Sequence, residues 1–220
     1  MTKPDVVIVL GVARSGTSCV SGMLSALGVD FDDGALLEAT AFNPKGYFES
    51  LLLNDLLDKQ VQSLRGAWQD WDVPLLPNVQ DYLDARIAAA TGVTIGIKDT
   101  RLVSCGLPVL RYLRDECGLD VRVVRTSRAK HANAKSLESW HAPVSAQKLS
   151  AMLNRHLEQT ERVLWRKKYL MQLVKYESVL ANPTIQAARL AEFAGTFTND
   201  VARAAEFVDP SLNHHGKATQ

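Results

Sequence analysis

Short apolar runs alternate along this chain with longer segments in which apolar residues recur every three or four positions. Apolar runs of about five residues are typical of buried strands, and the three-to-four spacing is typical of helices with one buried face. The runs predict strands at 6–10, 94–98, 121–125 and 170–176. The spacing predicts a first helix that ends at Leu27 and further helices at 49–64, 79–90, 107–117, 129–140, 145–166 and 184–194.

Strands separated by helices indicate the α/β fold class, with a parallel sheet wrapped by helices on both faces. Residues 28–46 and 66–77 carry the turn-forming residues and are predicted to be loops. No repeat, low-complexity tract or linker divides the sequence, so we expect a single domain over 1–220 with a loose polar tail at 209–220. Ligands of such sheets bind beyond the carboxyl ends of the strands.

The segment Gly11–Ser18, with the sequence GVARSGTS, joins the first predicted strand to the first predicted helix. A glycine loop in this position aims backbone N–H groups at one point, where the helix dipole also favours an anion. The segment therefore predicts a P-loop-type parallel sheet whose loop binds a phosphate. Thr17 occupies the lysine position of nucleotide hydrolases, and Arg14 is the only cation of the loop. A tight strand-to-helix turn with a Ser or Thr cap is the alternative.

Composition adds three expectations. The 220 residues are 46% hydrophobic and carry a net charge of +1, which is typical of a globular domain without an overall field for nucleic acid or anionic membranes. No stretch is long and apolar enough to span a membrane, and the first five residues lead directly into a strand, so we expect no signal peptide. Three cysteines without metal-ligand spacing suit a reducing, cytoplasmic setting.

Charged and polar residues follow two later strands. Arg125, Arg128 and Ser136 surround the end of the third strand, and a Ser eight residues after an Arg can bracket one phosphate with it. Lys98 and its neighbours end the second strand, where they form either an ion-pair brace or part of an anion site.

Two carboxylates come from the segment between the first two helices. Glu38 lies inside the predicted loop, and Glu49 begins the predicted helix, where it could favour the helix dipole or act as a base.

Together these segments resemble the sulfotransferases that use 3′-phosphoadenosine 5′-phosphosulfate (PAPS). The loop Gly11–Ser18 resembles their 5′-phosphosulfate-binding loop, and Arg128 with Ser136 is similar to their 3′-phosphate motif. Three further segments resemble blocks of the bacterial-type branch, in the same order along the chain: 43–49, 98–101 and 175–183. The resemblance spans most of residues 5 to 210.

The resemblance implies a transferase that moves a sulfuryl group from PAPS to a hydroxyl or amine, releases PAP and needs no metal. It implies that Arg14, Glu49 and Lys98 are catalytic, with Glu38 as the other candidate base. The residues that it assigns to PAPS binding are Ala13, Arg14, Ser15, Gly16, Thr17, Ser18, Arg128 and Ser136. Arg125 is the other candidate for the 3′-phosphate.

The sequence departs from the family pattern at three places. Thr100 replaces the proline of the bacterial branch. Arg128 is followed by Ala129 and Lys130, so the usual Arg-x-Pro turn is missing, and only 214–217 could serve as the adenosine lid. A kinase or nucleotide hydrolase with Asp99 on magnesium remains an alternative, as does a non-catalytic nucleotide-binding protein. The acceptor could be a carbohydrate, a lipid, a small phenol or a peptide.

Overall fold

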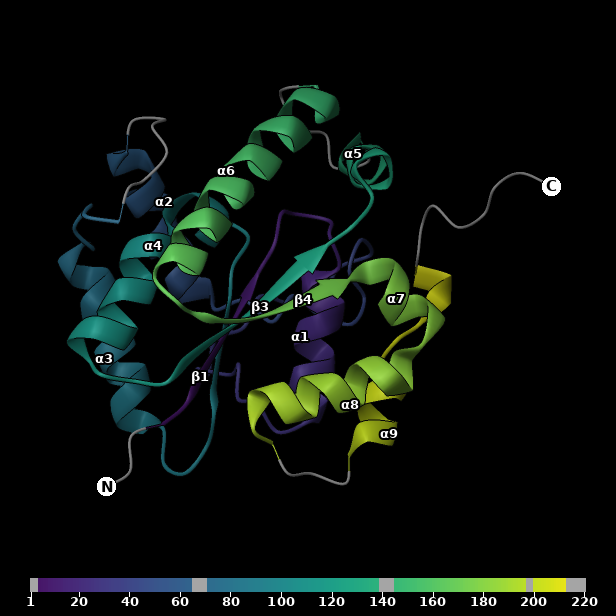
Figure 1. The fold of residues 1–220 in the computed structure, drawn as a ribbon, viewed down its shortest axis with the longest axis horizontal. Helices are drawn as coiled ribbons and strands as arrows, with labels where there is room; N and C mark the ends of the chain where they lie inside the picture. The colour runs from purple at the N-terminus through teal and green to yellow at the C-terminus, as the bar shows by residue number, and fades with distance from the viewer. Residues whose placement is uncertain (1–3, 65–70, 139–144, 197–199, 213–220) are drawn as a thin grey trace.

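A four-stranded parallel sheet forms the centre of the computed structural model, which describes residues 4–64, 71–138, 145–196 and 200–212 (Figure 1). The order of the strands is β2-β1-β3-β4. Their bounds are Val6–Leu10 for β1, Ile95–Lys98 for β2, Val121–Ser127 for β3 and Leu170–Lys175 for β4. All three pairs are parallel, so the four carboxyl ends meet at one edge of the sheet.

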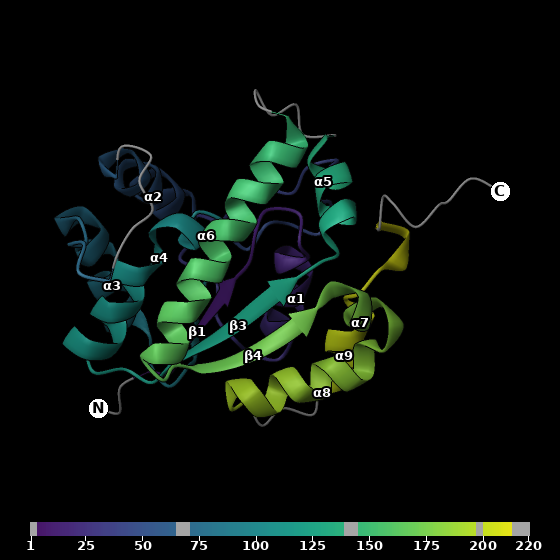
Figure 2. The same cartoon turned by 45° about the horizontal axis from the view of Figure 1, so that its top comes forward.

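Helices cover both faces of this sheet, as predicted. Figures 1 and 2 show α6 in front of the strands and α1 behind them. The α-helices are α1 Thr17–Ala26, α2 Leu51–Ser63, α3 Pro77–Ala89, α4 Leu102–Arg111, α5 Lys130–Glu138, α6 Ala146–Arg166, α7 Tyr176–Ala181, α8 Pro183–Ala194 and α9 Val201–Glu206. A π-helical turn, Tyr112–Glu116, extends α4, and a 3-10 turn covers Pro210–Leu212.

The core consists of two large apolar clusters, one on each face of the sheet, and a small third cluster that joins Ala13 to α5 and α6. Alternate side chains of a strand point to opposite faces. Accordingly, Val6, Ile8 and Leu10 of β1 pack with α2, α3, α4 and α6, whereas Val7 and Val9 pack with α1, α8 and α9. Every residue of β1 is buried, which explains its unbroken apolar sequence and fixes the position of the loop that follows it.

The structure corrects the predicted bounds of α4. This helix begins at Leu102 rather than Leu107 and carries a kink at Cys105, where φ is −132° and ψ is 16°. Pro108 has no N–H to donate to the carbonyl of residue 104, so the helix bends there instead of continuing regularly. The start of α4 therefore lies directly after the end of β2.

Two further corrections bear on the site. The strand β3 continues to Ser127, so Arg125 lies inside the strand and is not its last residue. The helix α2 begins at Leu51, because Ser50 accepts the Leu53 N–H as its N-cap, so Glu49 precedes the helix and is not in its first turn.

The carboxyl-terminal segment also differs from the prediction. The helix α9 was not predicted, and Pro210–Leu212 form a turn within the segment expected to be a loose tail. Residues 213–220 lie outside the described residues, as do 66–70 and the end of the helix predicted at 129–140. Of the helices that the structure describes, none has an apolar stretch long enough to cross a bilayer.

Candidate active site

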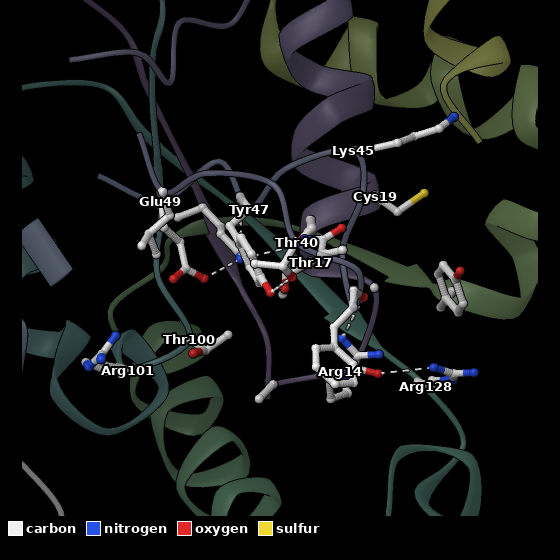
Figure 3. Close-up of a pocket in the computed structure, with 18 of the residues that line it drawn as sticks. Arg14, Thr17, Cys19, Thr40, Lys45, Tyr47, Glu49, Thr100, Arg101 and Arg128 are labelled. Atoms are coloured by element: carbon white, nitrogen blue, oxygen red, sulfur yellow. Dashed lines mark hydrogen bonds and ion pairs between the residues drawn. The ribbon is translucent and has the colours of Figure 1, made fainter. Parts of the chain in front are cut away.

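A cavity of about 710 Å³ opens beyond the carboxyl ends of the strands, where ligands of parallel sheets bind (Figure 3). Its wall comes from the loop after β1, the segment 37–49, the ends of β2 and β3, the start of α7 and the helices α2, α4 and α6. The segments singled out in the sequence thus contribute to one site.

The loop after β1 depends on two glycines. A Cβ atom at Gly11 would lie 2.0 Å from the Oγ1 of Thr126, and one at Gly16 would lie 2.4 Å from the ring of Tyr176. Gly16 has a φ of 91° and is the N-cap of α1. Arg14 also has a positive φ, 67°, which is unusual for a residue with a side chain. The first N–H groups of α1 have no acceptor inside the helix, so they can bind an anion in the cavity.

Five of the six loop residues predicted to bind PAPS line the cavity, namely Ala13, Arg14, Gly16, Thr17 and Ser18. The sixth, Ser15, is fully buried, and its Oγ lies 3.0 Å from the Oγ1 of Thr126 on β3. Its backbone N–H donates to the carbonyl of Val12 at 3.2 Å. Ser15 therefore attaches the loop to the sheet.

Arg14 extends from the loop into the cavity, where it contacts α5. Its Nε donates to the Oγ of Ser136 at 2.9 Å. Burial lowers the pKa of this guanidinium, and the nearby charge of Arg128 lowers it further. Ser136 is 1% exposed and lies behind Arg14, outside the cavity lining.

Arg128 lines the cavity on the same side. Its guanidinium stacks over the ring of Tyr176 with 5.1 Å to the centroid, and it donates to the carbonyl of Arg14 at 3.4 Å. The adjacent residue of the 175–183 block, Glu177, accepts the N–H of Ala129 at 2.9 Å. This block therefore holds the turn that carries Arg128.

Arg125 does not reach this cavity. Its Nη2 lies 3.2 Å from a carboxylate oxygen of Glu161 on α6. Of the two arginines considered for the 3′-phosphate, only Arg128 lines the site.

Lys98 and Glu49 form a buried ion pair at the end of β2, with 2% and 8% of their side chains exposed. The Nζ of Lys98 also donates to the carbonyl of Tyr47 at 3.0 Å and to the Oγ of Ser18 at 3.3 Å. The same lysine therefore braces the sheet edge and connects Glu49 to the loop after β1.

Asn54, which the sequence analysis missed, links Glu49 to a second buried carboxylate. Its Nδ2 donates to Glu49 Oε2 at 3.3 Å and to Asp99 Oδ2 at 3.2 Å. Burial, and after it the charge of Glu49, raise the pKa of Asp99 to about 6. The charge of Arg101 opposes this shift. The only signal in the sequence was a polar residue inside the apolar run 51–57.

Asn133 is a second residue that sequence reasoning missed. Its Nδ2 donates to the carbonyl of Ala13 at 2.7 Å, and its Oδ1 accepts from Ser150 at 2.8 Å. Asn133 is 1% exposed, so it fixes the backbone of the loop from behind.

Glu38 and several aromatic and cysteine side chains near the site are divided between the cavity and the core. Glu38 is exposed and lines the cavity, and the half-buried Tyr47 lines it too. Trp71 belongs to the core, where its ring meets that of Tyr169 edge-on. Cys19 lines the cavity, and burial raises its pKa to about 11, which does not favour a reactive thiolate. Trp68 and the 214–217 segment lie outside the described residues.

The magnesium-dependent alternative requires Asp99 as a metal ligand. Asp99 is 1% exposed and its carboxylate oxygens accept hydrogen bonds from Arg101 and Asn54. This geometry fits a structural anion better than a metal ligand. Within the part of the chain that the structure describes, no three His, Cys, Asp or Glu side chains are grouped to hold a metal ion.

No family model matches the chain, and no curated protein matches it by sequence. Solved structures do match it. A sulfotransferase from Mycobacterium tuberculosis superimposes with a TM-score of 0.52 at 15% identity, over 93% of this chain and 71% of that one. The sulfotransferase domain of a Synechococcus olefin synthase has a TM-score of 0.51 at 17% identity, over 98% and 84% of the two chains. Retinol dehydratase, solved with androsterone and the inactive cofactor PAP, has a TM-score of 0.47 at 15% identity, over 95% and 65%. The chain therefore has the α/β fold of the sulfotransferases.

Proposed function

We propose that this protein is a sulfotransferase that transfers the sulfuryl group of PAPS to a hydroxyl or amine of an acceptor. The observation that carries the proposal is the joint placement of two groups in one cavity of a sulfotransferase-like fold. A loop with Thr17 at the hydrolase lysine position and Arg14 as its cation, which we propose binds phosphate, lies next to the buried Glu49–Lys98 pair.

The residues on the loop side fit an adenosine bisphosphate. The N–H groups at the start of α1, with the hydroxyls of Thr17 and Ser18, would bind the 5′-phosphate. Arg14 would neutralise the charge that develops on the leaving phosphate oxygen. Arg128 would bind the 3′-phosphate, and Ser136 would hold Arg14 in place from behind. When bound, PAPS would supply the sulfuryl group, which carries less negative charge than a transferring phosphoryl group and needs no metal ion.

The base would be Glu49. Glu49 would accept the proton of the acceptor as the acceptor oxygen or nitrogen forms its bond to sulfur and the bond from sulfur to the phosphate oxygen breaks. Protonation of Glu49 removes the anion that Lys98 faces, so the ammonium group could then donate to an oxygen of the transferring group. Glu38 also lines the cavity, but no hydrogen bond from Lys98 reaches it among the described contacts.

Calorimetric titration tests the nucleotide part of this proposal. We expect PAP to bind in the presence of a chelator as tightly as in the presence of magnesium. The positive charges that would face its phosphates come from arginine and lysine side chains, which a chelator does not remove. ATP with magnesium is the matched ligand for the kinase alternative. Tighter binding of ATP with magnesium than of PAP would contradict the proposal.

A further inference from the structure

The side of the cavity opposite Arg128 is built differently from the loop side. Figure 3 shows Thr100 and Arg101 at one side of the view and Arg128 at the other. The helices α2 and α6 contribute four apolar side chains to the lining, Val61, Leu149, Met152 and Leu153, of which Leu149 also packs against the small apolar cluster that contains Ala13 of the loop after β1. We call these four residues the acceptor wall. It is continuous with Glu49 through Asn54, which lies on α2 and also lines the cavity.

The helices that form this side offer an incoming ligand no uncompensated charge. Among the described lining residues from α2, α4 and the turn before α4, Arg101 is the only charged one. Its guanidinium pairs with both Asp58 and Asp99. An anionic acceptor would therefore meet a cation that is already neutralised, and its own charge would lose hydration. Among the other described cations of the cavity, Lys98 pairs with Glu49, and Figure 3 shows Arg14, Lys45 and Arg128 away from Arg101.

Four polar side chains of the described residues line this side, Asn54, Thr100, Arg101 and Ser104, and all of them except Thr100 are shown with partners within the protein. The hydroxyl of Ser104 lies 2.9 Å from the Nδ1 of His156 on α6. Burial lowers the pKa of His156, and the charge of Arg155 lowers it further, which favours the neutral ring. A carbohydrate has a hydroxyl on nearly every carbon, and each needs a partner when buried. This part of the cavity cannot provide them in that number.

The acceptor wall leaves apolar surface open to solvent. Met152 lines the cavity and is 45% exposed. Phe42, which belongs to the segment 37–49 and also lines the cavity, is 48% exposed. A ligand that covered these side chains would gain about 25 cal/mol for each Å² of apolar surface removed from water. Apolar lining with a few polar groups is typical of sites for small organic molecules.

We infer that the acceptor is an uncharged apolar alcohol or phenol, whose hydroxyl lies at Glu49 and whose body packs on the acceptor wall. The inference rests on the proposed function and names its substrate class. It selects small apolar hydroxyl compounds over carbohydrates and anionic glycans.

Two phenols of equal length test this inference: 4-propylphenol and 4-(2-carboxyethyl)phenol. They present the same reacting hydroxyl and differ in the charge at the far end. We expect kcat/KM with PAPS to be at least about tenfold higher for 4-propylphenol, mainly through KM. In the Met152→Lys variant the new cation should reduce or reverse this preference. Met152 is half exposed, so the variant should fold.

The matched control is Ile185→Lys on α8, which also replaces an exposed apolar residue, 54% exposed, but lies outside the cavity lining. It should keep the wild-type preference. Binding of both phenols to the PAP-loaded protein, measured by calorimetry, gives a second readout without turnover.

The outcomes separate the inference from the proposed function. Preferential turnover or binding of the carboxylated phenol or of glucose, or binding of neither phenol, would overturn the inference. An unchanged preference in Met152→Lys would also overturn it. Selective binding of 4-propylphenol that Met152→Lys abolishes, without turnover of PAPS, would contradict the proposed sulfuryl transfer and support the apolar ligand class.

Discussion

The Nε of Arg14 donates a hydrogen bond to the Oγ of Ser136 at 2.9 Å, which joins the loop after β1 to α5. The family resemblance assigns the two residues to different phosphates of PAPS. In the structure they form one unit, because Ser136 is buried behind the arginine that lines the cavity. The serine therefore positions Arg14 in addition to any contact with nucleotide.

This contact predicts a combined effect for Ser136→Ala. The change removes the acceptor that orients Arg14, so PAPS turnover and PAP affinity should both fall. Hydrogen bonds to charged groups contribute about 1.5–3 kcal/mol, so each loss should be roughly tenfold or more. Steady-state kinetics and calorimetry measure the two quantities. A fall in PAP affinity with unchanged turnover at saturating PAPS would show that Ser136 does not act through Arg14.

Arg128→Ala should give a different pattern. Arg128 is the arginine of its segment that lines the cavity, and we expect it to bind the 3′-phosphate. PAP affinity should therefore fall by about tenfold or more, whereas adenosine 5′-phosphosulfate, which lacks that phosphate, should bind almost as before. Arg125→Ala serves as the control, since Arg125 pairs with Glu161 away from the cavity. A selective loss in Arg125→Ala instead would exchange the two assignments.

For Arg14 itself, the charge and the contact with Ser136 can be separated. Arg14→Ala should lower kcat by roughly a hundredfold or more, since a lost transition-state donor costs about that much, with a smaller effect on PAP binding. Arg14→Lys keeps the charge but not the Nε donor, so it should recover only part of the rate. Equal rates in Arg14→Ala and the wild type would remove Arg14 from the mechanism.

Asp99 predicts a pH dependence of stability. Burial, with the charge of Glu49, raises its pKa from the ordinary 3.8 to about 6, so the folded protein binds the proton more tightly than the unfolded chain. The contribution of this group to the free energy of unfolding should be most favourable below pH 4 and should decrease as the pH rises to about 6. Asp99→Asn removes the titration, so its stability relative to wild type should rise across this window, by roughly 1–3 kcal/mol.

Urea unfolding at pH 4.5 and pH 7.5 measures this difference. Asp58→Asn is the matched control, because Asp58 contacts the same Arg101 but is half exposed. A stability difference between Asp99→Asn and wild type that stays constant with pH would contradict the raised pKa.

The sequence predicted the sheet and the glycine loop after β1 because both depend on local patterns. Five consecutive apolar residues gave β1, and the glycines after it gave the loop. The start of α4 was missed because Gly106 and Pro108 are poor helix residues, and the helix is stabilised by tertiary burial instead. The end of β3 was missed because its last residues are polar, and pairing of Ser127 with Lys175 of β4 extends the strand.

Within the site, the sequence identified the charged residues but not their partners. Glu49, Lys98 and Arg128 were singled out and lie around one cavity. Which of Arg125 and Arg128 lines the cavity depended on where β3 ends. Asn54 and Asn133 could not be identified, since an asparagine in a helix has no local signature of the buried groups that it contacts.

The measurement that tests the central claim most directly is turnover of PAPS and 4-propylphenol by the purified protein, with both products quantified by mass spectrometry. The assay compares the wild type with Glu49→Gln and Glu38→Gln. The account predicts equal amounts of PAP and sulfated phenol from the wild type and from Glu38→Gln. Loss of a general base typically reduces the rate about a hundred- to ten-thousandfold, so Glu49→Gln should lose turnover to that extent while it keeps its PAP affinity and its circular dichroism spectrum. Near-normal turnover in Glu49→Gln with collapse in Glu38→Gln would assign the base to Glu38, and PAP binding without sulfated product from any acceptor would contradict sulfuryl transfer.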